Sequence, residues 1–107
     1  MGQLVDRSKR IRLHLPVEIR GQDLTGAAFT ERTRSLNISG GGILLESRHQ
    51  VSMGGRLELA IEVPASLRRH FAGCERYETM AVVCRVEHLE NEATSRIGAR
   101  FLARPTS

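Results

Sequence analysis

Aromatic residues are scarce in this sequence: it has no tryptophan, one tyrosine and three phenylalanines among 107 residues. Surfaces that stack single-stranded nucleic acid use several exposed aromatic side chains, so this scarcity argues against a nucleic-acid polymer as the partner. Cysteine is also rare. Cys74 and Cys84 form neither a CxxC pair nor a Cys/His cluster, and the four histidines are scattered. We therefore predict no metal site.

Long apolar runs and catalytic motifs are absent as well. No segment approaches the ~20 apolar residues of a membrane helix, and the N-terminus lacks the apolar core of a signal peptide. No GxSxG, Walker sequence or spaced acidic pair is found. The length of 107 residues, with 40% hydrophobic and 26% charged residues, suits one globular domain. We expect a cytoplasmic protein that is not an enzyme and does not span a membrane.

Positive charge is carried almost entirely by arginine, with Lys9 the one lysine among 16 basic residues and a net charge of +4. Arginine recognises phosphates and guanine edges through two parallel hydrogen bonds. A GC-rich genome produces the same bias, so composition alone identifies no ligand.

Apolar and polar residues alternate along six short segments, which predicts half-buried β-strands. Pro16 within the first segment predicts an edge strand or a bulge. The spacing of Leu67, Phe71 and Cys74 predicts a short helix around residues 65–75. The side chains expected to face the core are Leu13, Leu15, Val17 and Ile19; Leu36 and Ile38; Ile43, Leu44 and Leu45; Leu57, Leu59, Ile61 and Val63; Met80, Val82, Cys84 and Val86; and Ile97, Ala99 and Phe101.

Six strands separated by glycine-rich turns favour an all-β fold, either an antiparallel barrel or a compact sandwich. The chain shows no alternation of strands and helices, which excludes a doubly wound fold. Residues 1–12 are polar and basic, and we interpret them as a flexible N-terminal arm. The predicted domain covers residues 13–103, and residues 104–107 form a tail.

The segment Asn37-Ile38-Ser39-Gly40-Gly41-Gly42 is the best candidate for a binding site. An asparagine side chain can read a base edge, and a serine hydroxyl with glycine N–H groups can hold phosphate oxygens when glycine adopts positive φ. These residue types also form ordinary hairpin turns. The basic arm, taken alone, is typical of a solvated tail. Next to the Asn37–Gly42 segment, however, its arginines favour the binding interpretation.

Taken in order, the basic arm, the first strand and the NxSxxG segment resemble the PilZ domain family, the bacterial receptors for cyclic di-GMP. The closing segment Ile97–Phe101 resembles that family's last strand. The resemblance implies a six-stranded antiparallel β-barrel and two binding motifs, an N-terminal RxxxR and a later [D/N]xSxxG. Asn37, Ser39 and Gly42 match the second motif: Asn37 would read a guanine edge, Ser39 would support the site, and Gly42 would let the backbone turn.

The first motif departs from the family pattern. Its second arginine falls on Arg10, but the first falls on Asp6, and Arg7 lies one residue away. We predict that Arg7 and Arg10 bind the ligand together with Asn37, Ser39 and Gly42.

Two functions follow from this resemblance. The first is a cyclic di-GMP receptor that converts nucleotide binding into a changed contact with a protein partner or a fused output domain, with no other cofactor. The alternative is a degenerate PilZ domain that acts as a protein–protein adaptor without nucleotide, as Asp6 suggests.

Overall fold

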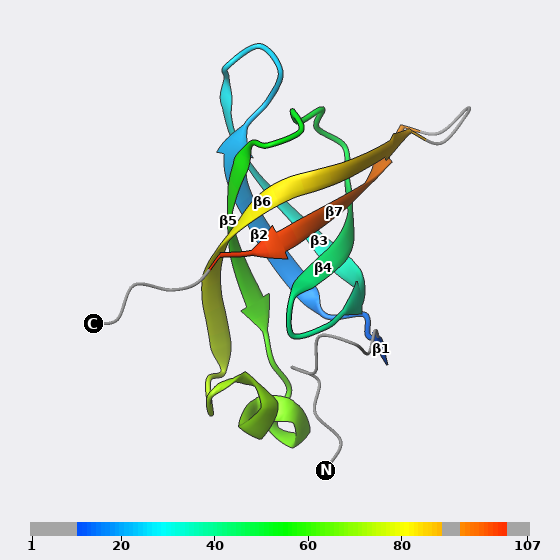
Figure 1. Ribbon diagram of the computed structural model, residues 1–107. Helices are drawn as coiled ribbons and strands as arrows, with labels where there is room; N and C mark the ends of the chain where they lie inside the picture. Colours follow the sequence, from blue (N-terminus) through cyan, green and yellow to red (C-terminus); the bar gives the residue numbers. More distant parts are fainter. Residues whose placement is uncertain (1–10, 89–92, 103–107) are drawn as a thin grey trace.

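The computed structural model describes residues 11–88 and 93–102, and these fold mainly into strands (Figure 1). The elements in chain order are β1 (Ile11–Arg12), β2 (Pro16–Gln22), β3 (Ala28–Ile38), β4 (Gly42–Ser47), β5 (Arg56–Glu62), the 3₁₀ helix η1 (Ala65–Phe71), β6 (Arg76–His88) and β7 (Ser95–Phe101). The short helix η1 lies where the sequence predicts one. Across the described ranges, no helix has the length and apolar character needed to cross a membrane.

Six of the strands form a closed antiparallel barrel. They pair in the order β3, β2, β5, β6, β7, β4, and the pairing of β4 with β3 closes the ring. This confirms the predicted six-stranded antiparallel barrel and rules out the sandwich. The two-residue strand β1 lies outside the ring and pairs with the end of β3.

Apolar side chains from the barrel strands fill the interior, as the alternation of β2, β5 and β7 predicts. Phe71 of η1 is also buried, and its ring meets that of Tyr77 edge-on at 5.6 Å. The buried apolar residues are Leu15, Val17, Ile19, Ile38, Ile43, Leu45, Val51, Leu57, Leu59, Ala60, Ile61, Val63, Phe71, Ala81, Val83, Ile97 and Ala99.

The predicted inward face of β6 is wrong at Met80 and Cys84, whereas Val86, beyond the bulge, packs against the core as expected. Thr79, Ala81 and Val83 face the core, whereas Met80 and Cys84 are exposed. Ala81 lies opposite a leucine of β5 and a phenylalanine of β7, so a small inward side chain fits there. Because apolar residues occupy consecutive positions in β6, both phases of alternation fit the sequence, and the larger methionine favours the incorrect one. A register shift after Val83 then moves Cys84 into a bulge.

The strand β3 also contains a register shift, between Ser35 and Asn37. Leu36 is therefore half-buried rather than fully inward, and Ser35 is buried in its place. Pro16 is the first residue of β2, close to this irregularity. Because β2 pairs with β3 on one side and β5 on the other, the expectation of an edge strand is wrong. The β2 pairings contain no register shift, so the bulge expected at Pro16 is not found in this strand and lies in β3 instead.

Glu31 is the one acidic residue among the buried side chains of the described chain. Its carboxylate accepts hydrogen bonds from the Ser47 hydroxyl at 2.6 Å, the Arg48 N–H at 2.9 Å and the His49 Nδ1 at 3.0 Å. The His49 ring stacks on Phe29 with centroids 4.1 Å apart. Burial by itself raises the pKa of Glu31, but these hydrogen bonds outweigh it, and the pKa lies below its ordinary value. The network joins β3 to the end of β4.

Candidate functional site

Asn37, Ser39 and Gly42 lie at the turn from β3 into β4. Ser39 is buried, and its Oγ accepts the N–H groups of Gly41 and Gly42, each at 3.2 Å. The Ser39 N–H donates to the Gly42 carbonyl at 2.9 Å. Two of the glycine N–H groups that we expected to hold a phosphate therefore donate to a side chain of their own turn, and Ser39 fixes the shape of that turn.

Gly42 is required by close packing rather than by its backbone conformation. Positive φ occurs at Gly26, Gly54 and Gly73, not at Gly42, so the expected positive φ at this motif position is absent. A Cβ at position 42 would lie 2.5 Å from the carbonyl oxygen of Ala99 in β7. Only glycine lets β4 begin this close to β7.

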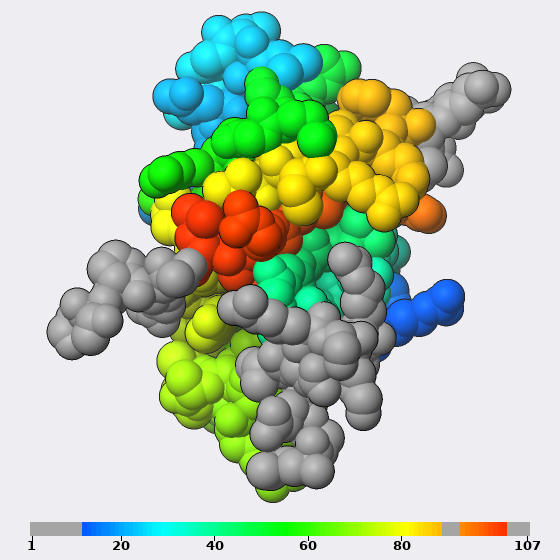
Figure 2. Space-filling view, viewed as in Figure 1, coloured from blue at the N-terminus to red at the C-terminus, as the bar shows by residue number. Residues whose placement is uncertain are grey.

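The motif is part of a row of residues that crosses four neighbouring strands. Arg12 of β1 pairs with Asn37 of β3, Asn37 pairs with Leu44 of β4, and Leu44 pairs with Gly98 of β7. All four are partly or fully exposed, so the expectation that Leu44 faces the core is wrong. The alternate positions of the same strands are buried: Ile38, Ile43, Leu45, Ile97 and Ala99. In Figure 2 the β7 residues (red) lie beside those of β4 (green) on the viewed face. The row forms an outward surface with an apolar centre and polar groups at the β1–β3 side.

Ser35, which the sequence did not single out as a site residue, supports this surface from inside the barrel. Its hydroxyl accepts the Leu15 N–H at 2.9 Å and donates to the Leu13 carbonyl, while the Ser35 N–H donates to the Leu15 carbonyl at 2.9 Å. These bonds hold the link between β1 and β2 against the bulge of β3. A small polar residue within a strand pattern is the only sequence signal for this role.

The predicted arm residues Arg7 and Arg10, and Asp6 beside them, lie outside the described residues. The structure does describe where the arm joins the barrel, because Ile11 follows Arg10 in the chain and pairs with Ile38. The arm is therefore attached next to the strand that carries the motif.

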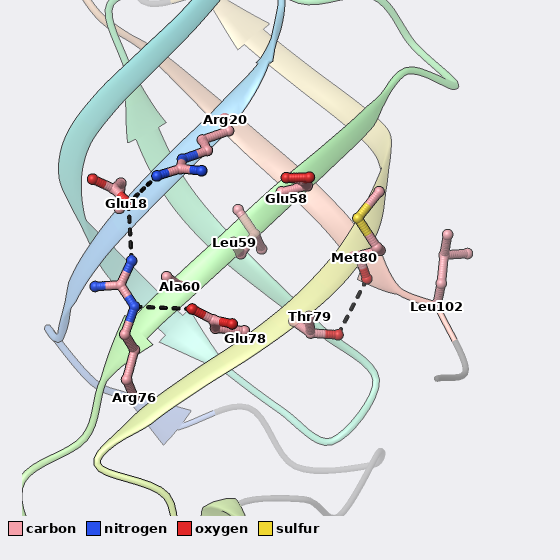
Figure 3. A pocket seen from close by; sticks show the side chains of 10 residues that line it. All are labelled: Glu18, Arg20, Glu58, Leu59, Ala60, Arg76, Glu78, Thr79, Met80 and Leu102. Carbon is pink, nitrogen blue, oxygen red and sulfur yellow. Dashed lines mark hydrogen bonds and ion pairs between the residues drawn. The ribbon is translucent and has the colours of Figure 1, made fainter. Parts of the chain in front are cut away.

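A separate hollow of about 330 Å³ lies on the opposite wall of the barrel, on the outward side of β2, β5 and β6 (Figure 3). Here the Arg76 guanidinium donates to Glu18 at 2.9 Å and to Glu78 at 3.1 Å, and Arg20 lies 3.7 Å from Glu18. The hydrogen bonds to Glu78 and then Glu18 raise the pKa of Arg76. Because opposite charges are paired within this hollow, it offers little attraction to a dianion. A second hollow, of about 570 Å³, lies where β2 turns into β3, and neither hollow is lined by the motif residues.

Within residues 11–88 and 93–102, no three histidine, cysteine, aspartate or glutamate side chains gather closely enough to hold a metal ion.

Comparison with known protein families identifies the domain. The family model of the PilZ domain matches residues 5–106, a span that includes all the predicted site residues. The chain belongs to the PilZ domain family. The resemblance drawn from the motifs is thereby confirmed, and the barrel described above is a PilZ barrel.

Solved structures with a similar fold include two PilZ-type proteins. The inhibitor of motility MotI/DgrA of Bacillus subtilis shares 26% identity with a TM-score of 0.64, over 86% of this chain and 40% of that protein. MrkH of K. pneumonia in its apo state shares 18% identity with a TM-score of 0.62, over 94% of this chain and 44% of MrkH. Another MrkH structure, described as a c-di-GMP-dependent transcription regulatory factor, gives a TM-score of 0.58 at 18% identity. The chain thus spans less than half the length of these proteins, and no curated protein matches its sequence.

Proposed function

We propose that this PilZ domain is a cytoplasmic receptor for cyclic di-GMP, and that nucleotide binding changes its contact with a protein partner or a fused output domain. The observation that supports this best is the pairing of Arg12 with Asn37. It attaches the basic arm beside the strand that carries the NxSxxG motif, so that both halves of the family's binding pattern can reach one ligand. The description of MrkH as c-di-GMP-dependent is consistent with this function.

The proposed chemistry is recognition without catalysis or a metal. Asn37 accepts from and donates to a guanine edge, while Arg7 and Arg10 bind phosphate or guanine with paired N–H groups. Ser39 and Gly42 hold the turn on which Asn37 is presented. Ordering of the arm over the nucleotide is the proposed switch, a disorder-to-order step that a partner can sense.

The adaptor function remains the second candidate, and Asp6 is the feature that favours it. A carboxylate at the first arginine position repels a ligand that carries two phosphate charges. An adaptor would bind its protein partner equally well with and without cyclic di-GMP. That a nucleic-acid polymer is not the partner also stays a prediction, and a titration with an unrelated RNA tests it.

Calorimetric titration with cyclic di-GMP tests the receptor function, with Arg10→Ala as the variant. Loss of a charge-assisted contact of ~1.5–3 kcal/mol lowers the affinity about tenfold or more. Arg10 lies outside the alternating apolar pattern, so we expect the thermal unfolding of the variant to match that of the wild type. Binding of Arg10→Ala at wild-type strength would refute the role of Arg10, and absence of binding by the wild type would favour the adaptor.

A further inference from the structure

Two exposed arginines flank the motif without belonging to it. Arg12 of β1 lies opposite Asn37, and Arg100 of β7 lies opposite Gly42. The next residue of β7 fixes this register, since its N–H donates to the carbonyl of Gly41 at 2.9 Å. Strand pairing therefore places one arginine on each side of the turn.

Neither of these two arginines has an acidic partner among the described residues, in contrast to Arg85 of β6 and Arg96 of β7. Arg85 lies 3.3 Å from Glu87, and Arg96 lies 3.9 Å from the same carboxylate. Neither Arg12 nor Arg100 forms an ion pair with any described residue. No carboxylate of the described residues neutralises their positive charge.

The residues that lie next to them in register are also uncharged. Arg100 has Gly42 on one side and Val82 on the other, and Arg12 faces Asn37. An anion placed over the turn therefore meets two positive charges without passing a carboxylate on these paired positions. Such a local excess of one sign attracts ligands of the opposite sign.

The separation of the two arginines suits one ligand held between them. Arg12 and Gly98 are three strand spacings apart along the row, and Arg100 lies two residues beyond Gly98. With ideal sheet dimensions, the Cα atoms of Arg12 and Arg100 are roughly 15 Å apart. Two long side chains can converge over the strands β3 and β4 that lie between them.

We propose that Arg12 and Arg100 bind the two phosphate groups of cyclic di-GMP from opposite sides of the motif, an inference that rests on the proposed function above. Their positive charge compensates for the arginine that the first motif lacks, since Asp6 stands at that position. The planar guanidinium forks hold phosphate oxygens through two parallel hydrogen bonds. Arg12 and Arg100 are thus further affinity determinants of the same site.

Calorimetric titration of the full chain with cyclic di-GMP tests this, using Arg12→Ala, Arg100→Ala and Arg100→Lys. Arg96→Ala is the matched control, because Arg96 shares the strand and outward face of Arg100 but is paired with Glu87. We expect each alanine variant of the proposed pair to bind about tenfold more weakly or worse, and Arg96→Ala to bind like the wild type. Arg100→Lys keeps the positive charge but loses the planar guanidinium group. We expect its affinity to lie between those of the wild type and Arg100→Ala.

Salt dependence provides a second readout. The loss of affinity in Arg100→Ala, relative to the wild type, should be smaller at 1 M salt than at 0.15 M. The reason is that the electrostatic screening length falls from about 8 Å to about 3 Å. The unfolding temperature of each variant should stay at the wild-type value, since Arg12 and Arg100 are exposed and have no ion-pair partner among the described residues.

The possible failures are distinguishable. If the wild type binds cyclic di-GMP and both alanine variants bind as tightly, the role of Arg12 and Arg100 is refuted while the receptor function stands. Equal weakening by Arg96→Ala and Arg100→Ala would also refute it, because only the overall charge would then matter. If the wild type binds no nucleotide, the receptor function and this inference fail together.

Discussion

Replacing Gly42 with alanine tests whether close strand packing explains this motif position. The new Cβ would lie 2.5 Å from the Ala99 carbonyl oxygen, whereas ordinary contacts begin at 3.4 Å. That oxygen belongs to a paired strand and cannot rotate away, so the start of β4 must move outward from β7. The movement strains the hydrogen bond from the Phe101 N–H to the Gly41 carbonyl and the turn held by Ser39.

We expect Gly42→Ala to lower the free energy of unfolding by about 2–4 kcal/mol, from ~1–3 kcal/mol for overpacking and about 1 kcal/mol for one weakened hydrogen bond. The unfolding temperature should fall by roughly 10 °C or more. Urea denaturation measures the change, and the midpoint should shift without a change in slope. Cyclic di-GMP binding should weaken too, because β4 and Arg100 of β7 no longer keep their register.

Gly26→Ala is the matched control. Gly26 has a φ of +88°, and a Cβ at this position would have no neighbouring atom within 4 Å, so alanine there meets conformational strain but no clash. It should destabilise the fold by about 1–2 kcal/mol and leave nucleotide binding unchanged. An ordinary surface substitution changes the free energy of unfolding by about 0.5 kcal/mol or less. If Gly42→Ala changes it by no more than this, the packing explanation of Gly42 is wrong.

Three further predictions concern Glu31, Asp6 and Asn37. Glu31→Gln should lower the free energy of unfolding at neutral pH by about 1–3 kcal/mol, because the donors around the carboxylate lose a charged acceptor. Since the pKa of Glu31 lies below its ordinary value of 4.5, its contribution is present above that pH and is lost as the pH falls through the folded-state pKa, so the stabilities of wild type and variant should converge in acid. Asp6→Arg should tighten cyclic di-GMP binding by ~1 kcal/mol, about fivefold, and Asp6→Asn should recover only part of this gain in calorimetry. Unchanged affinity in Asp6→Arg, with binding abolished in Arg7→Ala, would instead show that Arg7 and Arg10 already form the working pair. Asn37→Ala should weaken binding more than Asn37→Asp, because a carboxylate still accepts guanine N–H groups; equal losses would make Asn37 a turn residue only.

The barrel could be predicted from the sequence wherever one face of a strand is buried and the other is not. The alternation in β5 fixes which side of Leu59 and Ile61 faces inward, and the structure confirms it. The prediction failed at β6, where consecutive apolar residues fit both phases, and at Leu36, where a bulge changes the phase within a strand. A bulge depends on the partner strand, so the pattern of one strand does not reveal it.

The candidate site was predictable as a motif but not as a surface. Asn37, Ser39 and Gly42 are close in sequence, and their family pattern identifies them directly. The contact between Gly42 and Ala99 and the pairing of Gly42 with Arg100 arise from strands far apart in the chain. The residues around Gly42 in the sequence do not indicate which distant strand it pairs with. The packing that requires glycine at position 42 is therefore seen only in the folded structure.

The most direct test of the receptor function is to map cyclic di-GMP onto the barrel by amide chemical shifts of the ¹⁵N-labelled chain. We expect the signals of Asn37, Ser39 and Gly42 to shift on titration, together with that of Arg100. The signal of Glu78, in the hollow on the opposite wall, should stay in place. Shifts confined to that hollow, or none at saturating nucleotide, would contradict a cyclic di-GMP site at the NxSxxG motif.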